Sequence, residues 1–487
     1  MAIFFSNFLK NTTYTLPSPI SVIFCQIFIV IFVILRVPNL HKLILSFRLS
    51  PSSTVIVTFL VIVSIGTFLL LLPISTAPGK STSLIDAIFT ATSATCVTGL
   101  IVVDTGEHFS LFGQLTILIL IQIGGLGLMT FTSFFVLLSG EFGVRDRLVL
   151  RDMVKYDNLS KIGHLIFSIL ILTFSFEAVG AVLLYFQFLP TIKDTLFTAY
   201  SAIFHSISAF CNAGFSIYSN SFINYQKDIG VNLVMSFLII FGGLGFVVIV
   251  ELSQVITSYI KRKKRHLSLH SKLVLLTTAI LIILGTLLFY LGEKNGSLKN
   301  LPFGEKIMAS FFQSVTARTA GFNTLPIDKI TTFSAFLLIM LMFIGASPGS
   351  TGGGVKTSTF ATLIFTVKSI AEGKTQVEAF RRTIPQTSVY QALCVIILAL
   401  GWVGFSTLFL SFTEKSSFLK IFFEVFSAFG TVGLSRGLTP ELTIWGKIII
   451  IITMFTGRIG PLTLALAITE KKAIRRYEYP EERVIIG

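Results

Sequence analysis

Four short segments of the chain have the composition of backbone turns that could bind a cation through carbonyl oxygens. Each combines small or hydroxyl-bearing residues with one glycine, followed by leucine or phenylalanine: SATCVTGL, SAFCNAGF, VTARTAGF and SAFGTVGL. Their glycines, Gly99, Gly214, Gly321 and Gly433, recur after 115, 107 and 112 residues. A near-constant period of this length indicates a fourfold internal repeat.

Each turn follows a short apolar segment. We therefore predict that each repeat consists of a long helix, a short helix, the turn and a second helix. Around a pseudo-fourfold axis, four such turns would present rings of backbone carbonyls, which can replace the water shell of an alkali cation. Glycine suits these turns because it adopts positive φ and allows close approach. The predicted cation-binding residues are Cys96, Val97, Thr98 and Gly99; Cys211, Asn212, Ala213 and Gly214; Arg318, Thr319, Ala320 and Gly321; Gly430, Thr431, Val432 and Gly433.

A second glycine element follows each turn by 24 to 28 residues, inside the second helix of each unit. It begins at Gly124, Gly242, Gly345 and Gly457. Glycines in membrane helices commonly allow close packing or mark a kink, and we predict one of these two roles here.

The third of these elements differs from the others. The segment GASPGSTGGGVK is too rich in glycine and small polar residues, and contains a proline, to continue as a helix through lipid. Non-helical backbone at membrane depth must be buried in protein or line a cavity, so we predict a loop beneath the turns that obstructs the path. An ordinary cytoplasmic loop is the alternative. The predicted gating residues are Gly345, Ala346, Ser347, Pro348, Gly349, Gly352, Gly353, Gly354 and Lys356, together with Arg458.

Arg458 lies midway through an apolar segment. An arginine at that depth costs on the order of 3 kcal/mol on insertion scales, so it should face a cavity or a partner. Lys356 is weaker evidence, because it could also sit at the cytoplasmic interface. His205, in the second short helix, is predicted to pack rather than to bind a metal.

The elements that hold these residues must be membrane helices. The 487 residues are 53% hydrophobic and 13% charged, whereas soluble domains carry roughly 25% charged residues. At about 20 residues per span, eight long apolar segments stand out. They are roughly 54–73, 111–139, 162–189, 231–259, 272–291, 332–345 with its continuation, 387–411 and 446–468. The sequence therefore predicts an all-α polytopic membrane protein with eight core spans around a pseudo-fourfold central pore.

The predicted units are an N-terminal extension (1–49), four repeats and a tail. The repeats cover 50–140, 141–260, 261–383 and 384–470, and the tail covers 471–487. Lysine and arginine cluster before the first span and after the second, fourth, sixth and eighth, which places these segments, including the C-terminus, in the cytoplasm. The segment 20–35 is either a ninth span or an interfacial helix, and both readings stay open.

Other function classes find no support in the sequence. The cysteines, Cys25, Cys96, Cys211 and Cys394, are far apart and predict neither a disulfide framework nor a zinc site. Paired carboxylates, nucleophile–base pairs and phosphate-cradling loops are missing from the sequence pattern, so no enzyme is expected. The net charge of +15 comes from loops between spans, which indicates topology and not nucleic-acid binding.

With the four turns, SPGSTGGGVK and TGRIGP in hand, the chain resembles the Trk/Ktr/HKT superfamily of potassium transporters. The segments CVTGLIVVDT, ARTAGFNT, HLSLHSK and YPEERVIIG are most similar to KtrB-type membrane subunits of Ktr systems. The resemblance covers about residues 50–487 and leaves residues 1–49 outside.

This resemblance implies a multi-pass protein of the cytoplasmic membrane that takes up potassium as its substrate. It implies a homodimer with one pore in each protomer, docked on an octameric cytosolic ring of KtrA-type subunits, which bind the nucleotide in place of this chain. The family's filter glycines map to Gly99, Gly214, Gly321 and Gly433, its gating loop to Gly345 through Lys356, and its pore arginine to Arg458. Four glycines favour potassium over sodium, and sodium as an activator is left open.

Two alternatives remain at this point. A TrkH-like, proton-coupled subunit usually has two further N-terminal helices. A secondary transporter for a larger solute is usually built from inverted repeats, whereas these four units run in the same direction.

Overall fold

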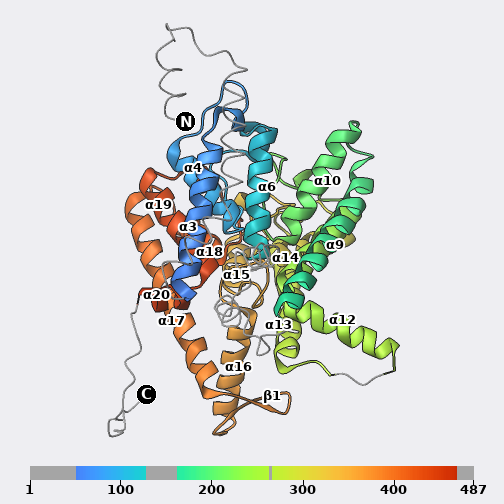
Figure 1. Ribbon diagram of the computed structural model, residues 1–487, viewed down its shortest axis with the longest axis vertical. Coiled ribbons are helices and arrows are strands. Elements are labelled where there is room, and N and C mark those ends of the chain that lie inside the picture. The colour runs from blue at the N-terminus through green and yellow to red at the C-terminus, as the bar shows by residue number, and fades with distance from the viewer. Residues whose placement is uncertain (1–50, 128–161, 263–265, 469–487) are drawn as a thin grey trace.

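The computed structural model describes residues 51–127, 162–262 and 266–468, and most of this chain is helical (Figure 1). Predictions for residues 1–50, 128–161, 263–265 and 469–487 lie outside the described residues. They include the segment 20–35, the end of the second expected span and the C-terminal tail.

The described helices follow one order four times. A long apolar helix comes first in each set: α3 (Pro51–Leu70), α9 (Ile162–Phe188), α13 (Leu269–Glu293) and α17 (Gln386–Thr413). A short helix follows: α4 (Leu84–Thr95), α10 (Thr195–Phe210), α14 (Phe303–Thr316) and α18 (Phe418–Gly430). A second helix completes the set: α6 (Leu111–Leu126), α11 (Ile229–Leu244), α15 (Thr332–Phe343) and α19 (Ile444–Ile459). The connections contain α5 (Thr105–His108) and the 3-10 turns η1 (Pro73–Ser75), η3 (Ile223–Tyr225), η4 (Ile327–Lys329) and η5 (Thr439–Glu441).

Side-chain caps define where most of these helices begin. A serine, threonine or aspartate precedes the first residue and accepts a hydrogen bond from a backbone N–H of the first turn. The residues that cap in this way are Ser83, Asp104, Ser110, Asp194, Asp228, Ser268, Thr331 and Thr443.

Three of the eight expected spans are not single continuous helices, and the continuation of the second span after α6 lies outside the described residues. α11 continues as α12 (Phe246–Ile260) after a bend of 102°. α15 is followed by a loop and α16 (Thr357–Ala371), and α19 by α20 (Pro461–Ile468). Gly127, Gly245 and Gly460 stand where α6, α11 and α19 end, with φ of 76°, 91° and 93°. Among the described residues, α3, α9, α13 and α17 each have the length and hydropathy of a membrane span, and α11 and α12 reach them together as a bent pair.

Close packing explains the other glycines of the same elements. A Cβ on Gly124, Gly242 or Gly457 would overlap a backbone carbonyl oxygen near the end of the short helix in the same unit. These oxygens belong to Thr95, Phe210 and Phe429. The glycine element thus serves both roles predicted from the sequence, since its first residue allows contact and its last one ends the helix.

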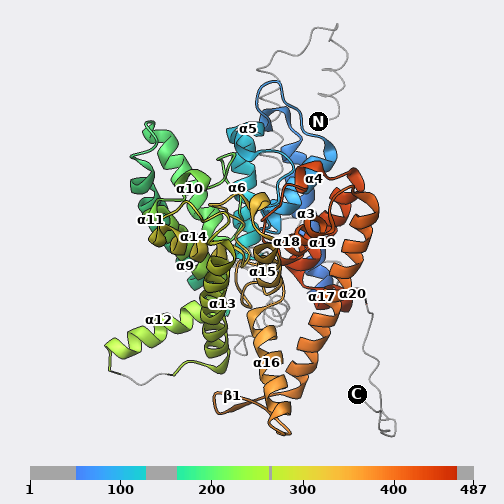
Figure 2. The same ribbon diagram turned by 180° about the vertical axis from the view of Figure 1, so that it is seen from behind.

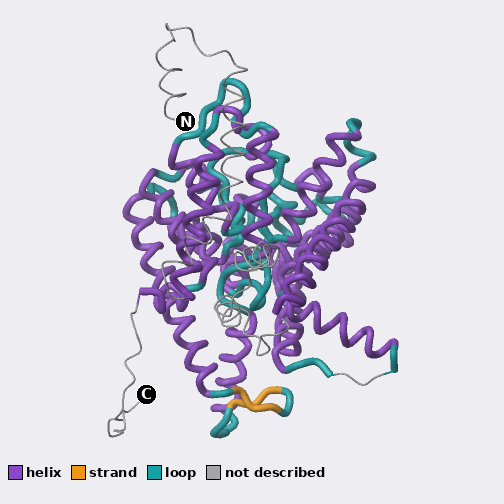
Figure 3. The backbone as a smooth tube through the Cα atoms, viewed as in Figure 1, coloured by secondary structure: helices purple, strands orange, loops and turns teal. Residues whose placement is uncertain are grey.

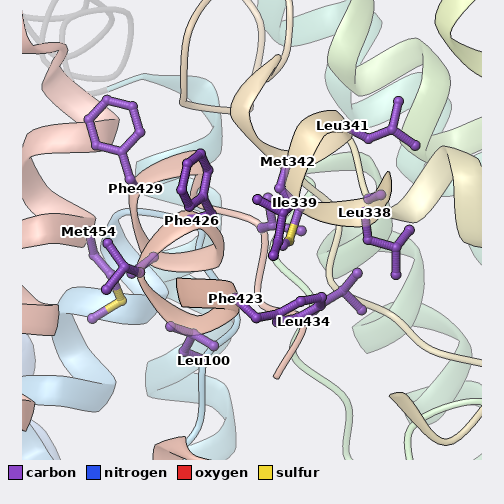
Figure 4. Packing of buried hydrophobic residues seen from close by; sticks show 14 of the residues in the cluster. Leu100, Leu338, Ile339, Leu341, Met342, Phe423, Phe426, Phe429, Leu434 and Met454 are labelled. Carbon is purple, nitrogen blue, oxygen red and sulfur yellow. The ribbon is translucent and has the colours of Figure 1, made fainter. Parts of the chain in front are cut away.

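The largest hydrophobic cluster lies between α15, α18 and α19. Phe426 and Phe429 of α18 pack against Phe343 of α15, with ring centroids 5.7 Å and 6.4 Å apart, and Ile339 and Met342 of α15 belong to the same cluster (Figure 4). Met454 of α19 and Leu100, just after the first turn, belong to the same cluster. The third, fourth and first units therefore share one core.

Polar contacts join each unit to the next. Tyr200 Oη donates to Gln114 Oε1 at 2.8 Å, and the Phe222 N–H donates to Asn323 O at 3.0 Å. Between the third and fourth units, Arg436 Nη2 donates to Asp328 O at 3.1 Å. Lys447 in α19 and Asp86 in α4 form an ion pair at 2.7 Å, which joins the fourth unit to the first.

A small β-hairpin is an addition to the all-helical architecture expected from the sequence. β1 (Val377–Ala379) and β2 (Arg382–Ile384) pair between α16 and α17, at one end of the molecule (Figure 2). The two-residue turn, Phe380 and Arg381, has positive φ at both positions, as a tight hairpin of this kind requires. Outside the membrane helices, hydrogen bonds to Glu378 and Glu372 raise the pKa of Lys374.

Because Lys447 and Asp86 close the ring of units, we expect Lys447→Met to destabilise the fold. The two side chains are only 15% and 19% exposed, so the loss should reach about 1 to 2 kcal/mol, more than for a surface pair. Thermal unfolding of the purified protein in detergent measures it. Lys299→Met removes an exposed lysine and is the matched control. Equal unfolding temperatures for the two variants would contradict this role.

Candidate functional site: a ring of four turns with a loop beneath it

All four predicted turns share one backbone conformation. Positive φ occurs at each turn glycine and again two residues earlier, at Val97, Asn212, Thr319 and Thr431. The values lie between 49° and 93°. This confirms the predicted positive-φ geometry, and Figure 3 shows loop segments gathered in the middle of the bundle.

The turns meet one another in a closed ring. A Cβ on Gly99 would overlap Ala213 O, and one on Gly321 would overlap Val432 O. The same overlap is found from Gly214 to Ala320 O, and from Gly433 back to Thr98 O. Each glycine therefore packs on the backbone carbonyl just before the next glycine, in the order first, second, third, fourth, first. Any side chain at these positions would push two turns apart.

Hydroxyl groups at the ends of the short helices hold the turns. Ser93 Oγ donates to Leu100 O at 2.8 Å, and Ser208 Oγ donates to Phe215 O at 2.7 Å. In the fourth turn, Ser427 Oγ accepts from the Gly433 N–H at 3.1 Å. The third turn has Val315 at this position, and the neighbouring Thr316 donates to Phe322 O at 2.6 Å instead. We did not single these residues out from the sequence, although the serine recurs in three of the four motifs.

Arg318 makes the third turn different from the others in charge. Its side chain is 7% exposed, and Nη2 donates to Thr278 Oγ1 of α13 at 3.3 Å. Its side chain therefore contacts the first helix of its own unit, and only its backbone belongs to the turn. The equivalent positions in the other units are the small residues Cys96, Cys211 and Gly430.

The predicted break in the third unit lies against the ring. Residues 344–356 are non-helical between α15 and α16. The Gly353 N–H donates to Thr431 Oγ1 of the fourth turn at 2.9 Å, and Thr351 Oγ1 donates to Phe210 O at the end of α10 at 3.2 Å. A Cβ on Gly352 would overlap Thr319 Oγ1 of the third turn. These contacts show that the loop packs directly against the second, third and fourth units.

The second helices of the other units fix the same loop. The Ser347 N–H donates to Gly243 O at 3.0 Å, and the Phe246 N–H at the start of α12 donates to Gly349 O at 2.9 Å. The Gly354 N–H donates to Gly457 O in α19 at 3.2 Å. The loop thus contacts elements of the second, third and fourth units directly.

Arg458 extends these contacts to the first unit. Its Nη1 donates to Thr351 O in the loop, and its Nη2 donates to Gly124 O in α6. The prediction that this arginine finds a partner is confirmed. The Arg458 guanidinium therefore binds two backbone carbonyls, one on α6 and one on the loop.

Lys356 and His205 also have defined partners. Lys356 Nζ donates to Gly352 O at 2.7 Å, so the lysine closes the loop on itself. His205 is fully buried, with Nδ1 2.8 Å from Ser201 O and Nε2 3.0 Å from Ser216 Oγ. The packing role predicted for His205 is confirmed. Within residues 51–127, 162–262 and 266–468, no group of three or more His, Cys, Asp or Glu side chains is placed to hold a metal ion.

Comparison with known proteins identifies the family of the chain. The TrkH family, described as cation transport protein, matches residues 21–477. The match includes residues 21–49, which lie outside the resemblance inferred from the sequence.

Several curated relatives are similar over nearly the whole chain. The Ktr system potassium uptake protein B of Bacillus subtilis is 41% identical over 447 residues, covering 90% of this chain and 97% of the relative. The potassium/sodium uptake protein NtpJ of Enterococcus hirae is 41% identical over 448 residues, covering 90% and 98%. The Ktr system potassium uptake protein B of Vibrio alginolyticus is 39% identical over 438 residues, covering 89% and 94%. These relatives are named as ion uptake proteins and not as enzymes.

The fold has a solved counterpart. The crystal structure of the potassium transporter TrkH from Vibrio parahaemolyticus aligns with a TM-score of 0.68 at 20% identity, covering 86% of this chain and 85% of that one. The family match and the 41% identity to Ktr proteins over most of the chain show that this protein belongs to the TrkH family of cation transport proteins.

Proposed function

We propose that this protein takes up potassium across the cytoplasmic membrane through the ring of four turns. The observation that carries the proposal is the closed ring, in which each turn glycine packs on the carbonyl preceding the next one. Four converging backbone segments can replace the hydration shell of a dehydrated cation with carbonyl oxygens. The cation-binding residues in this proposal are the sixteen predicted from the sequence, Cys96–Gly99, Cys211–Gly214, Arg318–Gly321 and Gly430–Gly433.

The loop is the gate in this proposal. It has contacts with all four units, one of them through Arg458, and its segment from Gly345 to Lys356 contains several glycines with soft backbone dihedrals. Arg458 adds a fixed positive charge beside the path, which raises the barrier for a cation leaving inward. Displacement of the loop opens the path.

The assembly follows the family's expected arrangement. Four repeats surround one pore in each protomer, with units at 50–140, 141–260, 261–383 and 384–470, and two protomers form a homodimer. A cytosolic nucleotide-binding ring biases the gate from the side of the basic loops and the C-terminus. Support for a Ktr-type system, and against a TrkH-like proton-coupled subunit, comes from the 41% identity to a Ktr protein. The name of the Enterococcus relative supports sodium as a second cation.

Uptake in a host without its own potassium systems tests the function. Potassium or rubidium should enter cells that express this chain, and more so with a co-expressed ring subunit. Absence of uptake with both chains in the membrane would reject the proposal.

Gly99→Ser should lower discrimination of potassium over sodium. The new side chain would overlap Ala213 O, and φ of 84° strains any residue other than glycine. We expect a loss of roughly tenfold, equivalent to about 1.4 kcal/mol of differential binding. Competition of sodium against rubidium uptake measures it.

Gly79→Ser is the matched control for this change. Gly79 has φ of 78°, but a Cβ there meets nothing within 4 Å. It therefore carries the same backbone strain without the collision. If Gly99→Ser discriminated as well as Gly79→Ser, the first turn would not belong to the filter.

Arg458→Gln should raise flux at equal membrane abundance. The change removes the fixed charge and the charge-assisted bonds to Thr351 and Gly124. We expect a rise of about threefold to tenfold, since each 1.4 kcal/mol taken from a barrier is tenfold in rate. Initial rates of rubidium uptake measure it.

Arg436→Gln is the matched control. Arg436 also donates to backbone carbonyls, but it does so between the third and fourth units. Equal rates for the two variants would leave Arg458 with a structural role only.

Deletion of Ser350–Gly353 should raise potassium flux and weaken its dependence on the ring subunit and its nucleotide. The deletion removes Thr351, which bonds to Gly242 and Phe210, and Gly353, which bonds to Thr431. Flux with and without the ring subunit measures both effects. A dimeric, membrane-inserted deletion protein with parental flux and parental nucleotide dependence would reject the gate.

A further inference from the structure

Glu177 is a buried carboxylate that belongs neither to the four turns nor to the loop. It lies in the middle of α9, and its side chain is 5% exposed. Within the described parts of the four long apolar helices, it is the only acidic residue away from a helix end. An ionisable group at this depth is costly to insert, so its partners indicate its role.

The partners of Glu177 come from two neighbouring helices. Gln122 Nε2 of α6 donates to Glu177 Oε1 at 3.0 Å. Cys211 Sγ, at the end of α10, lies 3.8 Å from the same oxygen. Ser206 Oγ of α10 donates to the backbone carbonyl of Glu177 at 2.7 Å. Glu177 thus joins the second helix of the first unit to the short helix of its own unit.

Cys211 belongs to the second turn. It caps α10 and directly precedes Asn212, whose φ is 57°. A Cβ on Gly125 would lie 2.5 Å from Cys211 Sγ and 2.8 Å from its Cβ, so the turn is packed directly on α6. Movement of Cys211 would therefore move the backbone that leads to Gly214.

The same short stretch of α6 also holds the gating contact. Gln122 contacts Glu177, Gly124 O accepts from Arg458, and Gly125 packs on Cys211. These three contacts fall within four consecutive residues at the end of α6. A displacement of this helix end would act on the turn and on the loop together.

We propose that Glu177 is a positioning residue that sets the cation selectivity of the second turn, through hydrogen bonds to Gln122 and Cys211. Its carboxyl oxygen fixes the end of α6 against α10, and so fixes the spacing of the second turn from the first and third. Glu177 acts through hydrogen bonding and not through charge. This proposal rests on the proposed cation-transport function.

Four variants test this role, each compared by sodium competition against rubidium uptake at equal membrane abundance. Glu177→Leu and Gln122→Leu each remove the bond between the two side chains. Each should lower discrimination against sodium by about fivefold, within the range that indirect positioning changes produce. The double variant should be no worse than Glu177→Leu alone, because that change already removes the bond to Gln122. Glu177→Gln can still accept from Gln122 and should retain the parental selectivity.

Ser206→Ala is the matched control. It removes a hydrogen bond to the backbone of Glu177, and its selectivity should stay parental even if thermal stability falls. Unchanged selectivity in Glu177→Leu overturns the proposal, and if that variant does not reach the membrane, Gln122→Leu decides. A Glu177→Gln protein as defective as Glu177→Leu also overturns it, because charge would then be the cause. A parental protein that does not transport rubidium would instead reject the proposed function.

Discussion

The structure depends on one constraint: chain that is not helical at membrane depth must be buried in protein with its polar groups paired, or must line a water-filled cavity. The four turns meet part of this constraint through hydrogen bonds to the ends of their own short helices. Hydroxyl groups of Ser93, Ser208, Thr316 and Ser427 bond to the backbone of the turns. Each turn glycine lies on the carbonyl of the next turn. A side chain at any one of the four positions would therefore separate turns that support each other.

The same constraint shapes the second helices. Helices α6, α11 and α19 pack on the ends of the short helices that carry the turns. The approach is so close that only glycine fits, at Gly124, Gly242 and Gly457. The helices then stop at Gly127, Gly245 and Gly460, where positive φ ends the regular hydrogen-bond pattern. Close approach and interruption are thus two consequences of the same glycine-rich element.

The sequence predicts what is repeated and local, and it misses what is long-range. The glycine period, the broken segment in the third unit and the depth of Arg458 all follow from residues close together in the chain. The partners of Arg458 do not, because Thr351 and Gly124 lie 107 and 334 residues away. The period of the second glycine element also does not distinguish close helix packing from a kink, since both use the same residues. Glu177 carried a usable signal as a lone carboxylate in an apolar helix, but its partners in α6 and α10 required the fold.

The proposed gate depends on a difference between the repeats. In the second and fourth units, a helix resumes directly after the glycine break, as α12 and α20. In the third unit, seven hydrogen bonds join the loop to other units, to Phe210, Gly242, Gly243, Phe246, Thr431, Gly457 and Arg458. At a net contribution of roughly 1 kcal/mol each, these bonds hold the loop with several kcal/mol. A partner that shifts an equilibrium from almost closed to almost open needs a differential affinity of about 5.5 kcal/mol. The free energy that holds the loop and the free energy that a partner must supply are of the same size. Bonds to other units can therefore hold the loop in a closed position and still be broken by a partner. A continuous helix at this place would lose its internal hydrogen bonds as well, and would not open at a comparable cost.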